Sequence, residues 1–216
     1  MKETSQTFIN FKAMIQNYIK TALRNIIKHR ALSAINILGL TIGLTAVILI
    51  GIYVRYEFSF DRFHEHAGQI YRIERKGKMD GESFHLPHTN NNIPRALAEE
   101  YPAINNYVRI WPANGMIRDL RNNIHQEGIY LADNSFFEIF TFPLKKGDRH
   151  TALESPYSVV MTEDMARKYF GDTEVIGKTL EAQVLDSSIT LNVTGIMQDM
   201  PDNSHLQSDI LVSYET

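Results

Sequence analysis

The sequence of 216 residues contains no cysteine, which excludes disulfides, thiolate nucleophiles and cysteine-based zinc sites. It also lacks a phosphate-binding G-x-x-x-x-G-K-[ST] loop, so we do not expect the chain itself to hydrolyse ATP. Neither a G-x-S-x-G nucleophile elbow nor an H-E-x-x-H zinc motif is present. Without a convergent set of catalytic side chains, the sequence predicts a protein that is not an enzyme and that uses no cofactor or metal.

Negative charge is scarce at the N-terminal end and abundant elsewhere. Residues 1–30 hold six basic side chains against Glu3, a net charge of +5, whereas the whole chain carries −3. Residues 31–216 therefore carry −8. A basic N-terminal segment followed by an acidic remainder is typical of a protein that is oriented across a membrane. This charge distribution argues against nucleic-acid binding. A mean hydropathy of −0.24 excludes several membrane spans but allows one.

The longest uncharged stretch comprises the 24 residues between Arg30 and Arg55. As a helix it would be roughly 36 Å long, against about 30 Å for the hydrocarbon core of a bilayer. Its apolar residues surround the helix axis, so no polar face remains. The residues after it, from Arg55 to Phe58, make a poor signal-peptidase site. The pattern therefore predicts an uncleaved transmembrane helix over residues 31–56.

Two glycines of this predicted span, Gly39 and Gly43, form a G-x-x-x-G motif. Such spacing allows another transmembrane helix to approach closely. The alternative is that the glycines have no special role, because glycine is common in membrane helices.

The segment before the span, from Phe8 to His29, has apolar residues at spacings of three and four. Its basic residues, which include Lys20, Arg24 and Lys28, fall mainly elsewhere on the predicted helix. A basic amphipathic helix of this kind is suited to lie along the cytoplasmic face of a membrane. Residues 1–30 are therefore predicted to be cytoplasmic. The helix is either a simple anchor or a docking element for a cytoplasmic partner.

The remaining residues, 57–216, are enough for an independent domain with mixed strands and short helices. Ser59 or Asp61 is expected to cap a short helix that ends near Gly68. A hairpin turn is expected at Asp80-Gly81. A short helix is expected within residues 92–102, with Pro94 near its start and Pro102 after its end. Asp133 is expected to cap another helix, and a further helix is expected between a Thr162 cap and a stop at Gly171. Strands are expected at 69–76, 106–111, 115–120, 124–132, 157–161, 178–186, 189–200 and 209–214, with the turn between the sixth and seventh at Asp186-Ser187-Ser188. Elements in this order indicate an α+β fold.

One group of histidines invites a metal-binding interpretation, at His64-Glu65-His66. Two histidines two positions apart on a helix point in different directions, and no third ligand is identifiable nearby. We therefore expect no metal there. His205 follows Asn203 and Ser204, which are better explained as residues that form turns and caps.

Several stretches resemble the FtsX/MacB-like ABC transporter permeases. The segment "NYIKTALRNIIKHRALSAINILGLTIGLTAVILIGIYVRYEFSFDRFHEHAGQIYRI" resembles the start of these proteins. Three others resemble their periplasmic core domain, namely "LADNSFFEIFTFPLKKGD", "SVVMTEDMARKYFGDTEVIGKTL" and "VTGIMQDMPDNSHLQSDILVS". The likeness covers nearly the whole chain, in the order of the family.

This resemblance implies an inner-membrane permease subunit that transmits motion from a cytoplasmic ABC ATPase to a periplasmic domain, for export or extraction of an unknown substrate. It implies a homodimer or a paired permease, allows a periplasmic adaptor, and suggests that Lys20, Arg24 and Lys28 couple the ATPase to the membrane span. His64 and Asn203-Ser204-His205 match family pattern positions, with a structural role. Complete members have at least three further spans, so we expect this chain to be an N-terminal portion with an incomplete periplasmic domain.

Two other functions compete with a permease. A membrane-anchored periplasmic sensor would report a ligand through the span, but only about thirty residues are predicted on the cytoplasmic side. A membrane-anchored periplasmic enzyme is disfavoured by the lack of a catalytic set of residues.

Overall fold

The computed structural model describes residues 2–119, 121–184 and 187–216, with side chains from Met14 onwards. The chain divides into two compact units, residues 1–58 and 59–216.

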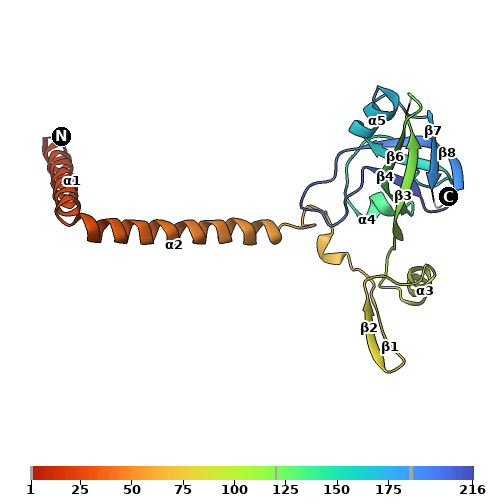
Figure 1. Cartoon of the computed structure of the whole chain (residues 1–216), viewed down its shortest axis with the longest axis horizontal. Coiled ribbons are helices and arrows are strands. Elements are labelled where there is room, and N and C mark those ends of the chain that lie inside the picture. Colours follow the sequence, from red (N-terminus) through yellow and green to blue (C-terminus); the bar gives the residue numbers. More distant parts are fainter. Residues whose placement is uncertain (1, 120, 185–186) are drawn as a thin grey trace. The chain divides into compact units, whose positions relative to one another are not determined.

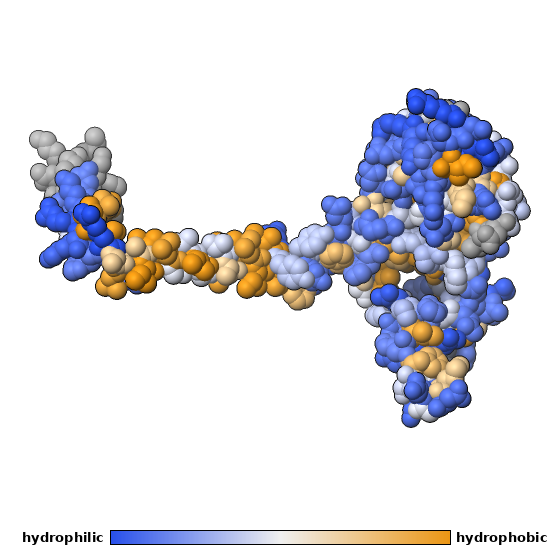
Figure 2. Space-filling model, viewed as in Figure 1, coloured by the Kyte–Doolittle hydropathy of each residue, from blue (hydrophilic) through white to orange (hydrophobic). Residues whose placement is uncertain are grey.

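Two helices make up the first unit, α1 (Lys2–Lys28) and α2 (Arg30–Glu57), with His29 between them (Figure 1). In the described part of the chain, α2 is the one helix that is long and apolar enough to cross a membrane. None of its residues is buried, and Figure 2 shows it as a mainly hydrophobic rod. Thr41 donates its hydroxyl proton to the carbonyl of Ile37 at 2.7 Å, so this polar side chain is satisfied within the helix itself.

The core of the second unit is a sheet of six strands that closes into a barrel, in the order β8-β6-β9-β4-β3-β7 and back to β8. These strands are β3 (Ile110–Arg118), β4 (Ile124–Ala132), β6 (Ser158–Thr162), β7 (Thr179–Val184), β8 (Ser187–Met197) and β9 (Ile210–Ser213). A short strand, β5 (Leu144–Lys146), extends the sheet from β8. Closure depends on β8, because its first half pairs with β7 and its second half with β6.

Apolar side chains fill both sides of the central strands. Val159 and Met161 of β6 belong to the cluster inside the barrel, whereas Val160 faces a second cluster with Phe136 and Phe137 of α4 (Phe136–Ile139). All five residues of β6 and all four of β9 are buried. Continuous apolar runs, rather than alternation, are expected of strands that are covered on both faces.

Helix α5 (Glu163–Phe170) has both of its predicted ends. The Thr162 hydroxyl accepts the backbone N–H of Met165, and Gly171 ends the helix at φ 70° in the left-handed region. The predicted Asp133 cap is wrong, because α4 begins after Ser135 and the Asp133 carboxylate instead binds Arg109. An ion pair with a distant arginine replaces the local cap.

In the sequence, the part of the second unit that precedes the barrel strands contains η1 (Ala67–Gln69), the hairpin of β1 (Arg75–Met79) and β2 (Glu82–Leu86), and α3 (Ile93–Glu100). The hairpin turn is at Asp80-Gly81 as predicted, with φ of 52° and 86°. The predictions for α3 and the α+β class are also confirmed.

Three local predictions are wrong. The helix capped by Ser59 or Asp61 is absent, because both residues bind a distant loop and only η1 forms a helical turn before Ile70. Residues 70–74 are not a strand, since β1 pairs with β2 only from Arg75 onwards. The two strands predicted at 106–111 and 115–120 are a single strand, β3, because β4 pairs with it from Ile110 to Arg118 without interruption.

The remaining strands agree with the predictions, including β7 and β8 as an antiparallel pair. The predicted turn between them includes Asp186, which lies outside the described residues. Ser187 and Ser188, which we expected in that turn, are the first residues of β8.

Candidate functional site

In the described part of the chain, the most extensive polar contacts between residues far apart in the sequence join residues 59–61 to residues 203–205. We name this set the latch; it consists of Ser59, Asp61, Asn203, Ser204 and His205. The Asn203 side-chain amide donates to both the carbonyl and the hydroxyl of Ser59, each at 3.0 Å. In return, the backbone N–H of Asp61 donates to the Asn203 carbonyl at 3.0 Å. The latch therefore ties the residues directly after α2 to the loop between β8 and β9.

The Asp61 carboxylate is the centre of the latch. It accepts the Ser204 hydroxyl at 3.2 Å and the His205 backbone N–H at 3.0 Å, and the His205 ring nitrogen Nδ1 lies 2.7 Å from its second oxygen. Partial burial raises the pKa of Asp61, but the bonds from His205 and Ser204 outweigh that effect and the pKa is lowered. The carboxylate is therefore charged at neutral pH.

The backbone of Asp61 adopts φ 54°, in the left-handed region that non-glycine residues seldom occupy. Aspartate tolerates this conformation better than most residues, and here its backbone and side chain are both held by the 203–205 loop. A conformation of this kind persists where surrounding contacts enforce it.

A second contact holds the same segment through His64, whose side chain is 5% exposed. Its Nδ1 accepts the backbone N–H of Thr141 at 3.2 Å, and the rings of Phe63, Phe140 and Phe142 pack around the imidazole. Burial lowers the pKa of His64, although the charge of Asp61 partly opposes this. The imidazole is therefore neutral at neutral pH, and its proton is on Nε2, which is buried and finds no hydrogen-bond partner among the described residues.

The predicted membrane residues are exposed in the first unit. Lys20, Arg24 and Lys28 follow one another at intervals of four, which places them in one row along α1. A Cβ atom added at Gly39 or Gly43 would meet no atom within 4 Å, so this side of α2 is open. From the sequence, Lys20, Arg24, Lys28, Gly39 and Gly43 were predicted as functional residues. Of the latch residues, Ser59 and Asp61 were predicted as helix caps, and Asn203, Ser204 and His205 as turn or cap formers and family pattern positions.

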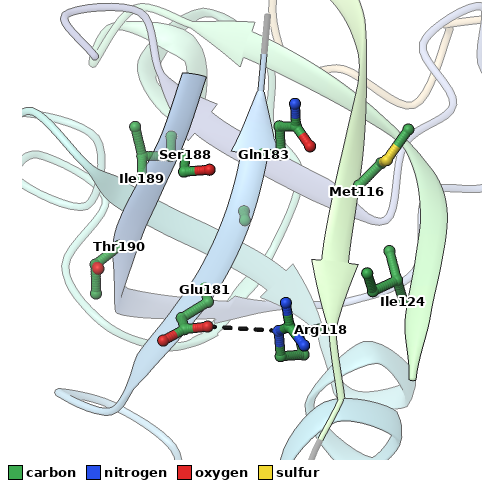
Figure 3. Close-up of a pocket in the computed structure, with 9 residues that line it drawn as sticks. Met116, Arg118, Ile124, Glu181, Gln183, Ser188, Ile189 and Thr190 are labelled. Carbon is green, nitrogen blue, oxygen red and sulfur yellow. Dashed lines mark ion pairs between the residues drawn. The ribbon is translucent and has the colours of Figure 1, made fainter. Parts of the chain in front are cut away.

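A hollow of about 320 Å³ lies on the outer side of β3, β7 and β8 (Figure 3). Arg118 and Glu181 form an ion pair of 3.5 Å across it, and both side chains are substantially exposed. Met116 and Ile124 add apolar surface on one side of the hollow. Among the residues that line this hollow, the structure pairs no nucleophile with a base.

The two histidines of the His64-Glu65-His66 pattern lie in different surroundings. His64 is buried and His66 is exposed, so the two side chains do not converge. Among the described residues, no group of three or more histidine, aspartate or glutamate side chains has a geometry that could hold a metal ion.

Comparison with known proteins gives one family match. The MacB-like periplasmic core domain matches residues 33–216. None of the curated proteins matches the chain. A solved domain of a protein described as a permease from Porphyromonas gingivalis is 26% identical, with a TM-score of 0.51, and the likeness covers 62% of this chain and 56% of that one.

Two other solved structures are less similar. The periplasmic region of MacB from Actinobacillus actinomycetemcomitans is 17% identical, with a TM-score of 0.35 and coverage of 51% of this chain and 49% of that one. The extracellular domain of the noncanonic ABC-type transporter YknZ from Gram-positive bacteria is 13% identical, with a TM-score of 0.34 and coverage of 50% and 52%. The chain thus spans about half the length of each solved relative.

Proposed function

Because the chain belongs to the family of MacB-like periplasmic core domains, we propose that it is part of a permease subunit of an ABC transporter. In this proposal α2 crosses the inner membrane, α1 is cytoplasmic and residues 59–216 are periplasmic. The subunit transmits motion from a cytoplasmic ATPase to its periplasmic domain and catalyses no reaction itself. The substrate is exported or extracted by the assembled transporter.

The observation that carries this proposal is the latch. Helix α2 ends at Glu57, and the latch begins two residues later at Ser59. Its other half, residues 203–205, lies a few residues before β9, which sits between β6 and β4 in the barrel. A shift or rotation of α2 therefore pulls on a central strand of the barrel through several hydrogen bonds, and not through a single flexible linker.

The row Lys20, Arg24 and Lys28 supports a docking role for α1. At 100° per residue, Arg24 lies about 180° from Ile15 and about 160° from Ile26 around the helix axis. When the apolar side of α1 lies in the membrane surface, Arg24 therefore faces the cytoplasm. We propose that this row contacts the ATPase.

The open side of α2 at Gly39 and Gly43 suits a helix from a second permease subunit. Small residues four positions apart allow two backbones to approach closely in lipid, where packing rather than the hydrophobic effect drives association. We propose that a homodimer or a paired permease forms there, and that a periplasmic adaptor joins the assembly.

The test measures motion with the full-length permease and its ATPase in nanodiscs. Spin labels on the barrel at Glu154 and on the partner permease report distances with and without ATP. In the Asn203→Ala and Asp61→Ala variants we expect the ATP-dependent distance change to disappear, while ATPase binding persists, because only the latch is broken. Asn105→Ala, an exposed asparagine outside the latch, is the matched control. An unchanged distance shift in both latch variants would overturn the proposal.

A further inference from the structure

The hairpin of β1 and β2 is a sheet of only two strands (Figure 1). Two isolated strands are marginally stable in water, and three or more are needed for independent stability. The hairpin is held partly by Phe84, whose ring lies across Gly77 on the facing strand: a Cβ at Gly77 would approach the ring to 2.5 Å. The guanidinium of Arg75 lies 5.6 Å from the centre of the same ring. One face of the hairpin is thus closed by its own side chains.

The outer edge of β1 is open to another strand. Met79 and Glu82 flank a two-residue turn, and such flanking residues exchange both backbone hydrogen bonds. Alternation along the ladder then leaves the backbone N–H and C=O groups of Lys76 and Lys78 pointing away from β2. Within the described residues, no further strand pairs with β1.

The positive charge of the β1 strand favours an acidic partner at this edge. β1 has three basic side chains, at Arg75, Lys76 and Lys78, and no acidic one. The two lysines are exposed and share one face of the strand, since side chains alternate between faces. Pairing two β1 edges from two copies of the chain would bring these lysines together, and like charges on facing strands are destabilising.

We propose that the free edge of β1 binds an extended acidic segment of a partner protein as a third strand. Main-chain hydrogen bonds to Lys76 and Lys78 provide the attachment, as in other cases of strand addition. Carboxylates of the segment lie beside the two lysine side chains. Apolar residues at the alternate positions lie on the opposite face, beside Met79, which is 69% exposed. The recognised pattern is therefore acidic and apolar residues in alternation.

The test uses the full chain in detergent micelles, labelled with ¹⁵N for NMR, and a seven-residue peptide of alternating glutamate and valine. We expect the peptide to shift the amide signals of Lys76 and Lys78. The Lys78→Pro substitution removes one outward N–H and should abolish binding, while Lys76→Glu/Lys78→Glu should weaken it about tenfold or more by repulsion. Ser83→Pro is the matched control, because Ser83 faces Lys78 across the hairpin and its N–H points to the other edge. It should bind the peptide like the unchanged chain.

The Phe84 ring reports whether each variant keeps the hairpin, since it shifts the signals of the Gly77 α-protons beneath it. With the hairpin intact, failure of the acidic peptide to bind would overturn the proposal and leave the lysines as protection against edge pairing. Equal binding of a lysine–valine peptide, or loss of binding in Ser83→Pro, would also overturn it. If Lys78→Pro instead abolishes self-association of the chain, the occupant is a second copy and the proposal is wrong.

Discussion

Helix α2 and strands β6 and β9 are the most apolar segments of the chain, yet they lie in opposite surroundings. None of the residues of α2 is buried by the protein, whereas every residue of β6 and β9 is. The barrel strands bury their side chains against two clusters of the same unit. Apolar composition alone therefore does not identify a core, because α2 leaves exposed the kind of apolar surface that β6 buries against protein.

The largest effect should come from placing a charge in each of the two segments. Val160→Asp introduces a carboxylate between β6 and α4, so we expect it to lower the free energy of unfolding by more than about 4 kcal/mol. Leu44→Asp in α2 should leave barrel stability unchanged but oppose membrane insertion by about 2.5–3.5 kcal/mol. Denaturant titration followed by Tyr and Trp fluorescence, with membrane fractionation, measures both. Unfolding of the barrel by Leu44→Asp would contradict the claim that α2 and the barrel strands lie in opposite surroundings.

The same contrast should hold for ion pairs. Arg109 lies in a partly buried cluster: it donates to both oxygens of Asp133, reaches Glu215 at 3.0 Å and stacks 4.0 Å from the Tyr214 ring centre. The Asp133 hydrogen bonds raise its pKa further, despite partial burial. We expect Arg109→Ala to cost about 1.5–3 kcal/mol of unfolding free energy, because Asp133 loses its charged partner.

The matched control for that substitution is Arg95→Ala, which removes an exposed pair with Glu99 on α3. No measurable change in the denaturation midpoint is expected there, since solvent screens the exposed charges. Equal losses in the two variants would show that burial does not decide the strength of these pairs.

A smaller effect is expected from pH, through His64. Burial lowers its pKa in the folded state, so below the unfolded pKa of about 6.5 the unfolded chain binds more protons. Stability should therefore fall as the pH decreases from 7.5 through 6.5 towards 5. His64→Phe, which suits a niche of three phenylalanine rings, should reduce this slope, whereas His66→Gln at an exposed site should retain it. Denaturation midpoints across that pH range measure the slopes. Identical slopes in the unchanged chain and both variants would contradict a lowered pKa of His64 as the cause.

Local chemistry in the sequence was sufficient to predict the elements that depend on near neighbours. Thr162 caps the start of α5, Gly171 ends it, and Asp80-Gly81 makes the hairpin turn. Each of these features depends on contacts with residues only a few positions away. The long apolar run predicted α2 for the same reason.

Features that depend on distant partners could not be predicted in this way. Asp133 has the chemistry of a helix cap, but Arg109 is 24 residues away and outcompetes that local role. Asp61 likewise suits a cap, and its partners are 143 and 144 residues away. The closure of the barrel follows from β8 pairing with β7 and then with β6, which no local pattern reveals. Resemblance to the family indicated residues 203–205 as pattern positions but not their contact with Asp61.

In the proposed topology, α2 crosses the membrane between a cytoplasmic α1 and an external barrel. Because the chain has no cysteine, single substitutions at Ser5 and Ser187 give clean labelling sites on the two sides of α2. In intact spheroplasts treated with an impermeant maleimide, we expect labelling of Ser187→Cys and no labelling of Ser5→Cys until the membrane is permeabilised. Labelling of Ser5→Cys but not of Ser187→Cys would reverse the topology and contradict it.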